Sequence, residues 1–569
     1  MRAPMLWLAL AMHVAFATTY AWSTPHFEGP DENSHYEYAW HLAGAGKLPL
    51  TPSLQAERGA LQTEAAVLAH HPPLYYALVA GVIAGSGQRD ALFSPRLNPS
   101  FGAPAAASKD LKFLHERAPD ALLNWLRMTS VLLGALSIFC VHRLGRVCCP
   151  AAPRVADLAG LLVACLPMWS SLHGLLNNDV LAATLSSATT LALASTLQRE
   201  RVGLGRAAGL GGLLGLAWLT KLTTLFLGGL AAAVAATMLL RRRIEWRAVF
   251  VTAFVALAVS GWWFVRNAAV HGDLLAMSAH DASFQPLPPE LRWPYLLGLD
   301  PAAPAFLPEL LRSLFGRFGW FQVGPHPALA WCGAVAAGLA VLGLVRASFD
   351  RERRCLPRGG WLLVLSCGAV LLGAAYFNYK VYQPQARLLF PAVAPGAVLL
   401  AAGLVRISEG VPRRRLAIWL LPAAAAAAFF VTFRPALAPQ LAPAPVEHRS
   451  MVGGIVDPAG DESIAWRVAP PDAPLDAAPA LAWRDDGASP ETKYSLYAFD
   501  ADGRVWLATH EWTAGGLVIS GDAFEVPANV WAFLPRGLPL SLRLRRLPAA
   551  ADEQPRALAC TPRWRVTRR

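Results

Sequence analysis

Eleven apolar stretches recur along this chain, and each is close to the length that a helix needs to cross a bilayer. A spanning helix needs roughly 17–25 mainly apolar residues. The stretches are 6–22, 123–144, 155–173, 180–197, 207–220, 222–240, 248–265, 327–345, 360–377, 388–405 and 416–433, of which 207–220 is the shortest. Since 55% of the 569 residues are hydrophobic, the composition is that of a polytopic membrane protein. Residues 6–22 would suit a signal peptide or a signal anchor, and we favour the anchor because the polar residues that follow it belong to the candidate site.

Arginines between the stretches predict how the chain is oriented. They cluster in alternate connections, at 143–154, 199–206, 241–247, 346–358 and 406–415. If the N-terminus is cytoplasmic and the short apolar run 72–84 does not span the membrane, all these connections face the cytoplasm. If that run were counted as a span, every arginine cluster would face outward, against the positive-inside bias. We therefore expect two helices on the outer membrane face, at 33–48 and 72–83. The net charge of +12 is then orientation charge, and no nucleic-acid partner is expected.

The first outer loop, residues 23–121, begins with two adjacent carboxylates. Asp31 and Glu32 follow a Gly-Pro turn directly after the first apolar stretch, and His35 lies one helical turn further on. Pro30 ahead of two acidic residues is a helix start signal. A capped helix with a solvated acidic end would explain this pattern on its own.

Other unusual polar residues fall on the same predicted side of the membrane. They are His70, His71 and Tyr75 in the first loop, Asn178 and Asp179 after the third stretch, Lys221 between the fifth and sixth, Arg266 and Asn267 at the end of the seventh, and Arg387 at the start of the tenth. Capping, snorkelling or anchoring at the interface would account for several of them singly. Ionisable groups at membrane depth are costly and usually face a cavity, so their agreement on one leaflet predicts a site.

The residue types suit the displacement of a lipid-linked phosphate from a sugar carbon. A carboxylate such as Asp31, with Glu32 beside it, can act as general base on an acceptor hydroxyl or amine. Lys221, Arg266 and Arg387 can bind a phosphate and stabilise it as it leaves. A divalent cation is an alternative participant, although no spacing in the sequence is specific to a metal site.

The pattern changes after residue 435. A Pro- and Ala-rich linker is followed by short alternating runs separated by Asp-Gly and Gly-Asp turns. We expect a transmembrane domain over residues 1–435 and a small periplasmic, sandwich-like β-domain over 436–569. Tryptophans of this domain, at 483, 506, 512 and 531, would either stack on sugars or fill its core.

Taken in order, the motifs resemble the GT-C superfamily of polytopic glycosyltransferases. They are Pro30-Asp31-Glu32-Asn33-Ser34-His35, His71-Pro72-Pro73-Leu74-Tyr75-Tyr76, Asn177-Asn178-Asp179, Leu219-Thr220-Lys221, Trp263-Phe264-Val265-Arg266-Asn267 and Gln385-Ala386-Arg387-Leu388-Leu389-Phe390-Pro391. Within that superfamily residues 1–435 are most similar to a broad bacterial membrane-protein family, and distantly similar to the protein mannosyltransferases and the lipid A aminoarabinose transferases. Ala386 and Leu389 depart from the Gly and Tyr usual in the last motif.

The resemblance implies an inner-membrane enzyme that transfers a sugar from a polyprenyl-phosphate-linked donor to a periplasmic glycan, lipid or protein, with inversion. It implies Asp31 as the base and Lys221, Arg266 and Arg387 as ligands of the donor phosphate. Three rival readings remain open on the residues alone: a transporter or flippase for lipid-linked glycans, a polymerase or ligase with a diphosphate-linked donor, and a non-catalytic assembly protein built around the β-domain.

Overall fold

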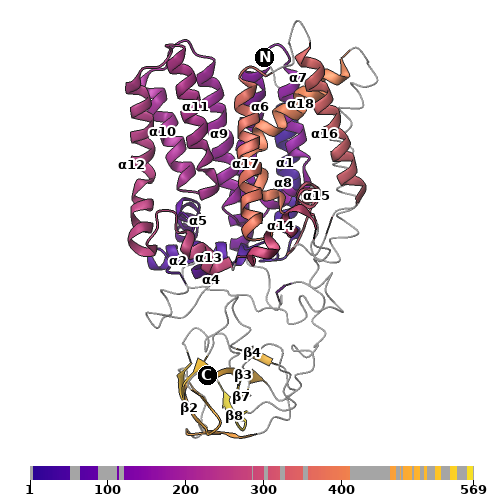
Figure 1. Cartoon of the computed structure of the whole chain (residues 1–569). Coiled ribbons are helices and arrows are strands. Elements are labelled where there is room, and N and C mark those ends of the chain that lie inside the picture. Colours follow the sequence, from indigo (N-terminus) through magenta and orange to yellow (C-terminus); the bar gives the residue numbers. More distant parts are fainter. Residues whose placement is uncertain are drawn as a thin grey trace. The chain divides into compact units, whose positions relative to one another are not determined.

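The computed structural model places the apolar stretches in a bundle of helices and the C-terminal part in two small sheets (Figure 1). The residues it describes are 4–51, 64–87, 112–113, 121–284, 286–299, 305–320, 324, 327–349, 357–409, 462–468, 475, 479–489, 492–499, 505–508, 519–526, 539–546 and 560–567. The chain forms two compact units: the first comprises Met1–Thr51, Val67–Leu92 and Ala118–Ala442, and the second comprises Pro52–Ala66, Phe93–Arg117 and Pro443–Arg569. The mainly helical fold with a β-region near the C-terminus confirms the predicted fold class.

Eight helices of the described residues are long and apolar enough to cross a membrane, or nine if one bent pair counts as a span. These eight contain α1 (Pro4–Ser23), α6 (Ala121–Cys148), α9 (Asp179–Leu197), α11 (Phe226–Leu240), α12 (Trp246–His271), α16 (Pro327–Ser348), α17 (Gly360–Lys380) and α18 (Val393–Ser408). The helix α10 (Leu204–Trp218) is not one of the eight. At 15 residues α10 is shorter than a typical span. Ten of the eleven predicted stretches thus appear as helices, and 416–433 lies outside the described residues.

The predicted span 155–173 is broken. It consists of α7 (Arg154–Ala164) and α8 (Pro167–His173), which meet at an angle of 64°. Pro167 begins α8 and cannot donate the backbone hydrogen bond that would continue α7, so the helix bends there. The bend carries residues 174–178 towards the first outer loop.

The shorter helices gather at one end of the bundle. They are α2 (Glu32–Ala45), α5 (Leu74–Gly85), α13 (Met277–Phe284), α14 (Pro289–Leu297) and α15 (Phe306–Arg312), with three 3-10 turns, η1 (Leu222–Thr224), η2 (Ser313–Phe315) and η3 (Ala386–Ala392). The four-residue helix α4 (Glu64–Val67) belongs mostly to the second unit. In Figure 1 α2, α5 and α13 lie at the end opposite the N-terminus. The predicted helices at 33–48 and 72–83 are confirmed as α2 and α5, although α2 begins at Glu32 with Asp31 as its N-cap.

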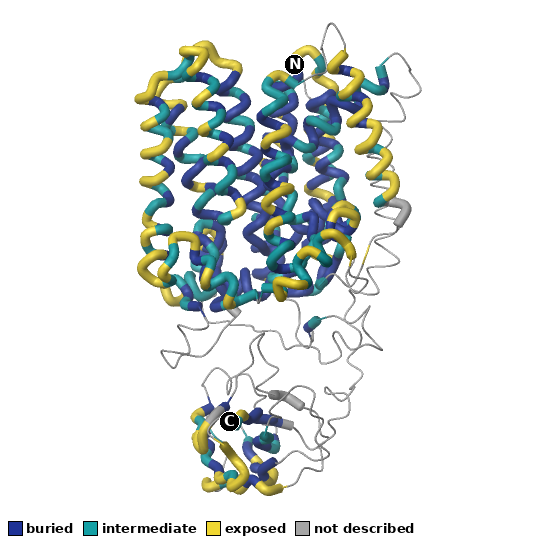
Figure 2. The backbone as a smooth tube through the Cα atoms, in the orientation of Figure 1, coloured by how far each residue is buried: buried dark blue, intermediate teal, exposed yellow. Residues whose placement is uncertain are grey.

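Burial separates the core helices from those at the edge of the bundle (Figure 2). Most of the apolar window of α9 is buried, at 72%, against 22% for α12 and 17% for α16. The peripheral α16 packs on α18 with backbones in contact, because a Cβ added at Gly343 would collide with the carbonyl of Gly403. Side chains on the outer faces of α12 and α16 are apolar and exposed, as expected for surfaces that face lipid.

The second unit has two antiparallel sheets around one core. One sheet has the order β1-β2-β6 and the other β4-β3-β7-β8, with β5 paired to β3. The strands are β1 (Ile464–Trp466), β2 (Ala480–Asp485), β3 (Lys493–Phe499), β4 (Val505–Ala508), β5 (Ile519–Ser520), β6 (Ala523–Glu525), β7 (Pro539–Arg546) and β8 (Trp564–Thr567). Trp483 is fully buried in the core, so it is not a sugar platform; the side chains of the other three tryptophans predicted here lie outside the described residues.

Candidate active site

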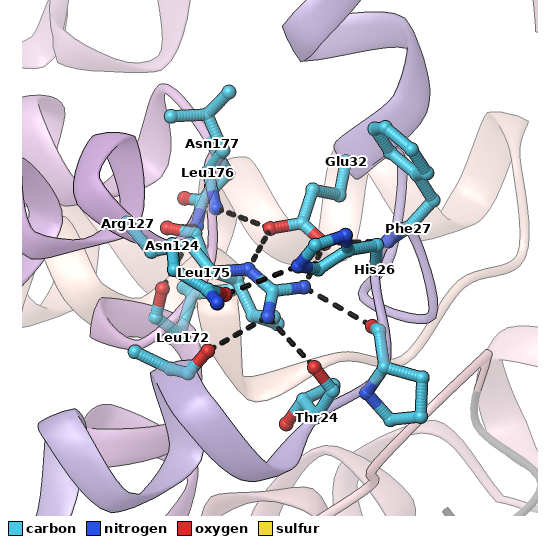
Figure 3. A network of polar contacts seen from close by, with 12 residues as sticks. Thr24, His26, Phe27, Glu32, Asn124, Arg127, Leu172, Leu175, Leu176 and Asn177 are labelled. Atoms are coloured by element: carbon cyan, nitrogen blue, oxygen red, sulfur yellow. Dashed lines mark hydrogen bonds and ion pairs between the residues drawn. The ribbon is translucent and has the colours of Figure 1, made fainter. Parts of the chain in front are cut away.

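A buried ion pair fixes the loop between α1 and α2 (Figure 3). Arg127, near the start of α6, donates to Glu32 through Nε at 2.8 Å and through Nη2 at 2.6 Å. Its remaining N–H groups reach the carbonyls of Ala21, Thr24 and Pro25 at 2.7–3.1 Å. Both charged side chains are 0% exposed. Through its N–H donors the guanidinium thus holds the end of α1 next to the start of α2.

Glu32 is saturated in the same way. Besides Arg127 its carboxylate accepts the backbone N–H of Phe27 at 3.0 Å and that of Leu176 at 2.9 Å. The second of these bonds ties the loop to the segment after α8. Glu32 was predicted as a catalytic carboxylate beside Asp31, but its oxygens face protein donors and no substrate can reach them without breaking these bonds.

Asp31 is held in an unusual backbone conformation by this arrangement. Its φ of 60° lies in the left-handed region, which a non-glycine residue rarely adopts and which Asp tolerates better than most. Phe27, four residues earlier, also has a positive φ, of 65°. Gly29, between them, packs so closely on Leu175 that an added Cβ would lie 2.5 Å from its Cδ1. Such strain of ~1–3 kcal/mol is kept where surrounding structure enforces it, often at functional sites.

A chain of alternating charges runs from Asp31 into the site. The Asp31 carboxylate accepts from Nη2 of Arg387 at 2.9 Å, and Nη1 of Arg387 lies 4.0 Å from Asp179. Asp179 in turn pairs with Nζ of Lys221 at 2.6 Å. The side-chain exposures are 32% for Asp31, 17% for Lys221, 11% for Arg387 and 4% for Asp179, so Asp31 is the most accessible member. The structure therefore brings together four of the residues that the sequence predicted, with Asp179 linking Arg387 to Lys221.

Local structure places each of these side chains. Asp179 lies in the first turn of α9, where the helix dipole favours a carboxylate. Lys221 lies in the extended break between α10 and η1, and the carbonyl of Leu219 just before it accepts the N–H of Leu74 at 3.0 Å. Arg387 lies in η3, where the preceding N–H of Ala386 donates to the buried Ser313 hydroxyl at 2.7 Å. Each charge is thus carried by a helix end or a break that another segment holds.

A second polar group, built on Tyr76, adjoins this chain. The Tyr76 hydroxyl lies 3.0 Å from Nδ1 of His35 and 3.1 Å from Nδ1 of His71. Asn178 reaches the same His71 nitrogen with its amide at 3.2 Å. When this amide and the Tyr76 hydroxyl donate to His71, the proton of His35 must lie on Nδ1, which leaves its Nε2 as an acceptor; this tautomer is assigned from the bond pattern.

Burial keeps the two histidines neutral. It lowers the pKa of His35 to about 3, although Asp31 and Asp179 oppose the shift. It also lowers the pKa of His71 well below its usual value, with His70 and Lys221 adding to the effect. Tyr75, another predicted pocket residue, is buried with its ring edge-on to His35 at 6.4 Å.

Arg266 and Asn267 lie apart from the chain of charges. The Arg266 guanidinium is 4.7 Å from the centre of the Trp263 ring and donates to the Asn267 side chain at 3.3 Å. Asn267 is buried and its amide donates to the carbonyl of Leu274 at 3.3 Å. Arg266 comes within electrostatic range of Tyr38, whose hydroxyl donates to the His71 carbonyl at 3.2 Å. It thus borders the Tyr76 group, and no ion pair is seen between it and Asp31 in the described residues.

A metal ion would need a group of His, Cys, Asp or Glu side chains as ligands. Within the described ranges, no three of these side chains are arranged to bind one ion. The divalent cation stays a prediction.

Sequence reasoning missed Arg127, Tyr76 and Ser313 as parts of this site. Arg127 had a signal, because it is a charged residue inside the predicted span 123–144. Tyr76 was one of two adjacent tyrosines, and sequence does not show which one faces the histidines. Ser313 precedes Arg387 by more than seventy residues, and no sequence pattern links the two.

Part of the chain matches a known protein family. Residues 123–263 match the sequence model of the dolichyl-phosphate-mannose-protein mannosyltransferase family. This match covers 141 of the 569 residues and agrees with the resemblance to the GT-C superfamily drawn from the motifs. No curated protein sequence matches the chain significantly.

Three solved structures are similar to parts of the chain. ArnT from Cupriavidus metallidurans bound to undecaprenyl phosphate is 15% identical over 76% of this chain and 65% of its own, with a TM-score of 0.46. AglB from Archaeoglobus fulgidus with an inhibitory peptide and a dolichol-phosphate is 13% identical over 77% and 54%, with a TM-score of 0.41. The Saccharomyces cerevisiae Pmt1-Pmt2 complex bound to the sugar donor is 15% identical over 50% and 34%, with a TM-score of 0.30. The aligned part spans slightly less than two thirds of the ArnT chain.

Proposed function

We propose that this chain is a membrane glycosyltransferase that moves a sugar from a polyprenyl-phosphate-linked donor to a periplasmic acceptor. The observation that carries the proposal is the chain of charges from Asp31 through Arg387 and Asp179 to Lys221. It joins a partly exposed carboxylate to two cations that suit a phosphate. The undecaprenyl phosphate named with ArnT is bound by that protein and supplies only the class of lipid proposed here.

In the proposed reaction Asp31 accepts the proton of an acceptor hydroxyl or amine as that atom attacks the anomeric carbon of the sugar. The new bond forms as the bond between this carbon and the phosphate oxygen breaks, and the configuration inverts because a single displacement occurs. Charge develops on the leaving phosphate oxygen, and Arg387 and Lys221 stabilise it. Asp31 returns its proton to water. The acceptor is a glycan, a lipid or a protein of the cell envelope.

The two neighbouring carboxylates receive different roles in this proposal. Asp31 has a side chain that is 32% exposed and faces a guanidinium, whereas Glu32 is fully buried with four donors on its oxygens. We therefore assign the base to Asp31 alone and give Glu32 a positioning role. Asp179, at 4% exposure, holds Lys221 in the pocket. Arg266 is proposed as a border residue that the donor phosphate reaches only if it extends towards Tyr38.

The location follows from the orientation of the helices. The chain is a multi-pass membrane protein, and the short helices of the site lie at the end of the bundle opposite the N-terminus (Figure 1). With the arginine-rich connections in the cytoplasm, this end faces the periplasm. We propose the bacterial inner membrane, with the β-domain periplasmic and engaged in positioning the acceptor. A transporter would keep its charged groups near the midplane, and the position of this chain of charges at one end favours an enzyme.

The variant Asp31→Asn tests the proposal. Loss of the base should lower the turnover of a radiolabelled polyprenyl-phosphate sugar by about 100-fold or more in purified protein, because general-base catalysis contributes roughly 10²–10⁴-fold. Asp157→Asn, on α7 and paired with His142, is the matched control and should keep its activity. Turnover close to that of the wild type in Asp31→Asn would contradict the assignment. A detergent assay has no compartments, so turnover there also separates an enzyme from a flippase.

A further inference from the structure

A second group of basic side chains lies beside the Tyr76 group and is not used by the mechanism above. His70 directly precedes His71, and the two rings stand at 83° with their centres 4.5 Å apart. The His70 ring packs edge-on against His280 of α13 at 5.4 Å and against Phe284 at 6.0 Å. Adjacent histidines of one loop thus take part in two different polar groups, His71 in the one on Tyr76 and His70 in the one on α13.

His70 is buried without the hydrogen bonds that its ring nitrogens require. It is 2% exposed, and in the described part of the chain neither nitrogen makes a hydrogen bond of good geometry, although the Val67 carbonyl lies near. Nε2 of His271, at the end of α12, is unpaired in the same sense. A buried polar atom left without a partner costs ~1–3 kcal/mol, so a natural structure with three such atoms on neighbouring rings usually has a ligand or water to satisfy them.

The charges around these rings come from four elements. Lys380, at the end of α17, pairs with Asp281 of α13 at 3.1 Å, and His280 lies 3.2 Å from the same carboxylate. Lys221 lies within electrostatic range of His70, His70 within range of His71, and Arg266 within range of His271. Asp273, the other carboxylate nearby, accepts four hydrogen bonds from its own turn, those of Leu275, Met277 and Ser278. The surplus of donors over free acceptors makes this a place for an anion.

The group of side chains around His70 is accessible from the side formed by α13 and α17. His70 is enclosed, whereas His280 is 17%, Lys380 26% and Asp281 32% exposed, so the group opens through α13 and α17. An anion that enters there can replace Asp281 as the partner of Lys380 and release that carboxylate to water. Burial, with His280 and His271 nearby, lowers the pKa of His70 to about 3 in the absence of such an anion. A bound anion would oppose this shift, so binding should be accompanied by proton uptake.

We propose that His70, His280 and Lys380, with His271 at the edge, form an oxyanion site next to the sugar-transfer pocket. Its ligand is a phosphate or carboxylate group carried by a substrate. The claim that this group belongs to a substrate rests on the proposed function. The claim that the site binds an oxyanion is independent of that function. Two sources share this chemistry: the acceptor, or a part of the lipid donor that extends beyond Lys221 and Arg387.

Sulfate is the probe for the test, because its charge does not change between pH 6 and pH 8. Binding of radiolabelled sulfate is measured by equilibrium dialysis with the full chain in nanodiscs of uncharged lipid. The wild type should bind sulfate more tightly at pH 6 than at pH 8. His70→Gln and His280→Gln should each weaken binding about tenfold at pH 6 and remove most of the pH dependence, since a charge-assisted hydrogen bond is worth ~1.5–3 kcal/mol.

Two matched variants separate this site from the pocket. His41→Gln changes a half-buried histidine of α2 that makes none of these ring contacts and should leave sulfate binding unchanged. Arg387→Gln should reduce only the part of binding that is independent of pH. If Arg387→Gln had no effect while the histidine variants did, the pocket assignment would fail and the oxyanion site would stand.

Undecaprenyl phosphate at saturating concentration identifies the source. If pH-dependent sulfate binding persists beside it, the site serves the acceptor; if it disappears, the site serves the donor lipid. Sulfate binding that is absent, or equal in wild type, His70→Gln and His280→Gln at both pH values, would overturn the proposal.

Discussion

Asp31 and Glu32 are neighbours in sequence, yet the protein treats them in opposite ways. Glu32 is fully buried, pairs with a fully buried arginine and accepts two backbone N–H groups as well. Asp31 lies just outside the helix in a left-handed conformation, with its carboxylate partly exposed and paired with the guanidinium of Arg387. The comparison shows that a fully buried ion pair, Arg127–Glu32, can hold the neighbouring and more exposed pair, Asp31–Arg387, in position. The predictions below test this division of labour.

The largest effect is expected from Arg127→Leu. This change leaves Glu32 buried without its counter-charge and frees three carbonyls, which should destabilise the protein by about 3–5 kcal/mol. Thermal unfolding in detergent should show a clearly lower midpoint. Arg143→Leu, on an exposed position of the same helix, should leave the midpoint nearly unchanged. Equal midpoints for the two variants would show that the buried pair does not hold the loop.

The next largest effect is expected in the chain of charges from Asp31 to Lys221. Arg387→Gln should weaken the binding of undecaprenyl phosphate by about 10- to 100-fold, because hydrogen bonds to charged groups contribute ~1.5–3 kcal/mol. Stability should change much less than in Arg127→Leu, since the Arg387 side chain is partly exposed. Arg406→Gln, near the other end of α18 and paired with Glu409, is the control and should bind as the wild type does. Equal affinities for Arg387→Gln and the wild type, measured by titration calorimetry, would remove Arg387 from the donor site.

A smaller effect should appear in the pH dependence of stability. The pKa of His35 is lowered by burial to about 3 in the folded chain, against about 6.5 when unfolded. The unfolded state therefore binds a proton that the folded state refuses, and stability falls as pH drops below about 6.5. His35→Gln should show a shallower fall of the unfolding midpoint between pH 7 and pH 5. The half-buried His41, changed to Gln, should alter this slope less; a steeper slope in His35→Gln would contradict the account.

The smallest effect is expected at Asp273, beyond the end of α12. Burial would raise its pKa slightly, but hydrogen bonds from Ser278, Met277 and Leu275 lower it to about 2. A carboxylate with a depressed pKa adds stability above its unfolded value, and this is lost as pH falls from about 4 towards 2. Asp273→Asn should thus lower the unfolding midpoint slightly at pH 7, and the difference should shrink on acidification. A difference that grows with falling pH would show that the turn does not stabilise the charged form.

Sequence patterns predicted the helices well, because apolar length and arginine placement are properties that each segment carries by itself. They also predicted that Asp31, Lys221 and Arg387 share one end of the bundle, since side follows from the number of crossings. The bend in 155–173 was visible only as Pro167, and its size depends on how α8 packs. Sequence could not separate Glu32 from Asp31, because the partner that distinguishes them, Arg127, is 95 residues away.

Arg266 also shows that the sequence does not predict tertiary contacts of a side chain. It lies on the predicted side, but its guanidinium packs on Trp263 one turn earlier in α12. The sequence predicts how deep such a residue lies in the membrane far better than it predicts the direction of its side chain. The pairs that define the candidate site, Asp31 with Arg387 and Asp179 with Lys221, arise from tertiary packing alone.

The most direct test is a cryo-electron microscopy structure of the full chain with undecaprenyl phosphate. The account predicts density for the phosphate between Nζ of Lys221 and the guanidinium of Arg387, on the side that Asp31 faces, with the Arg127–Glu32 pair intact. A phosphate bound elsewhere, with the Asp31–Arg387 and Asp179–Lys221 pairs both undisturbed, would contradict it.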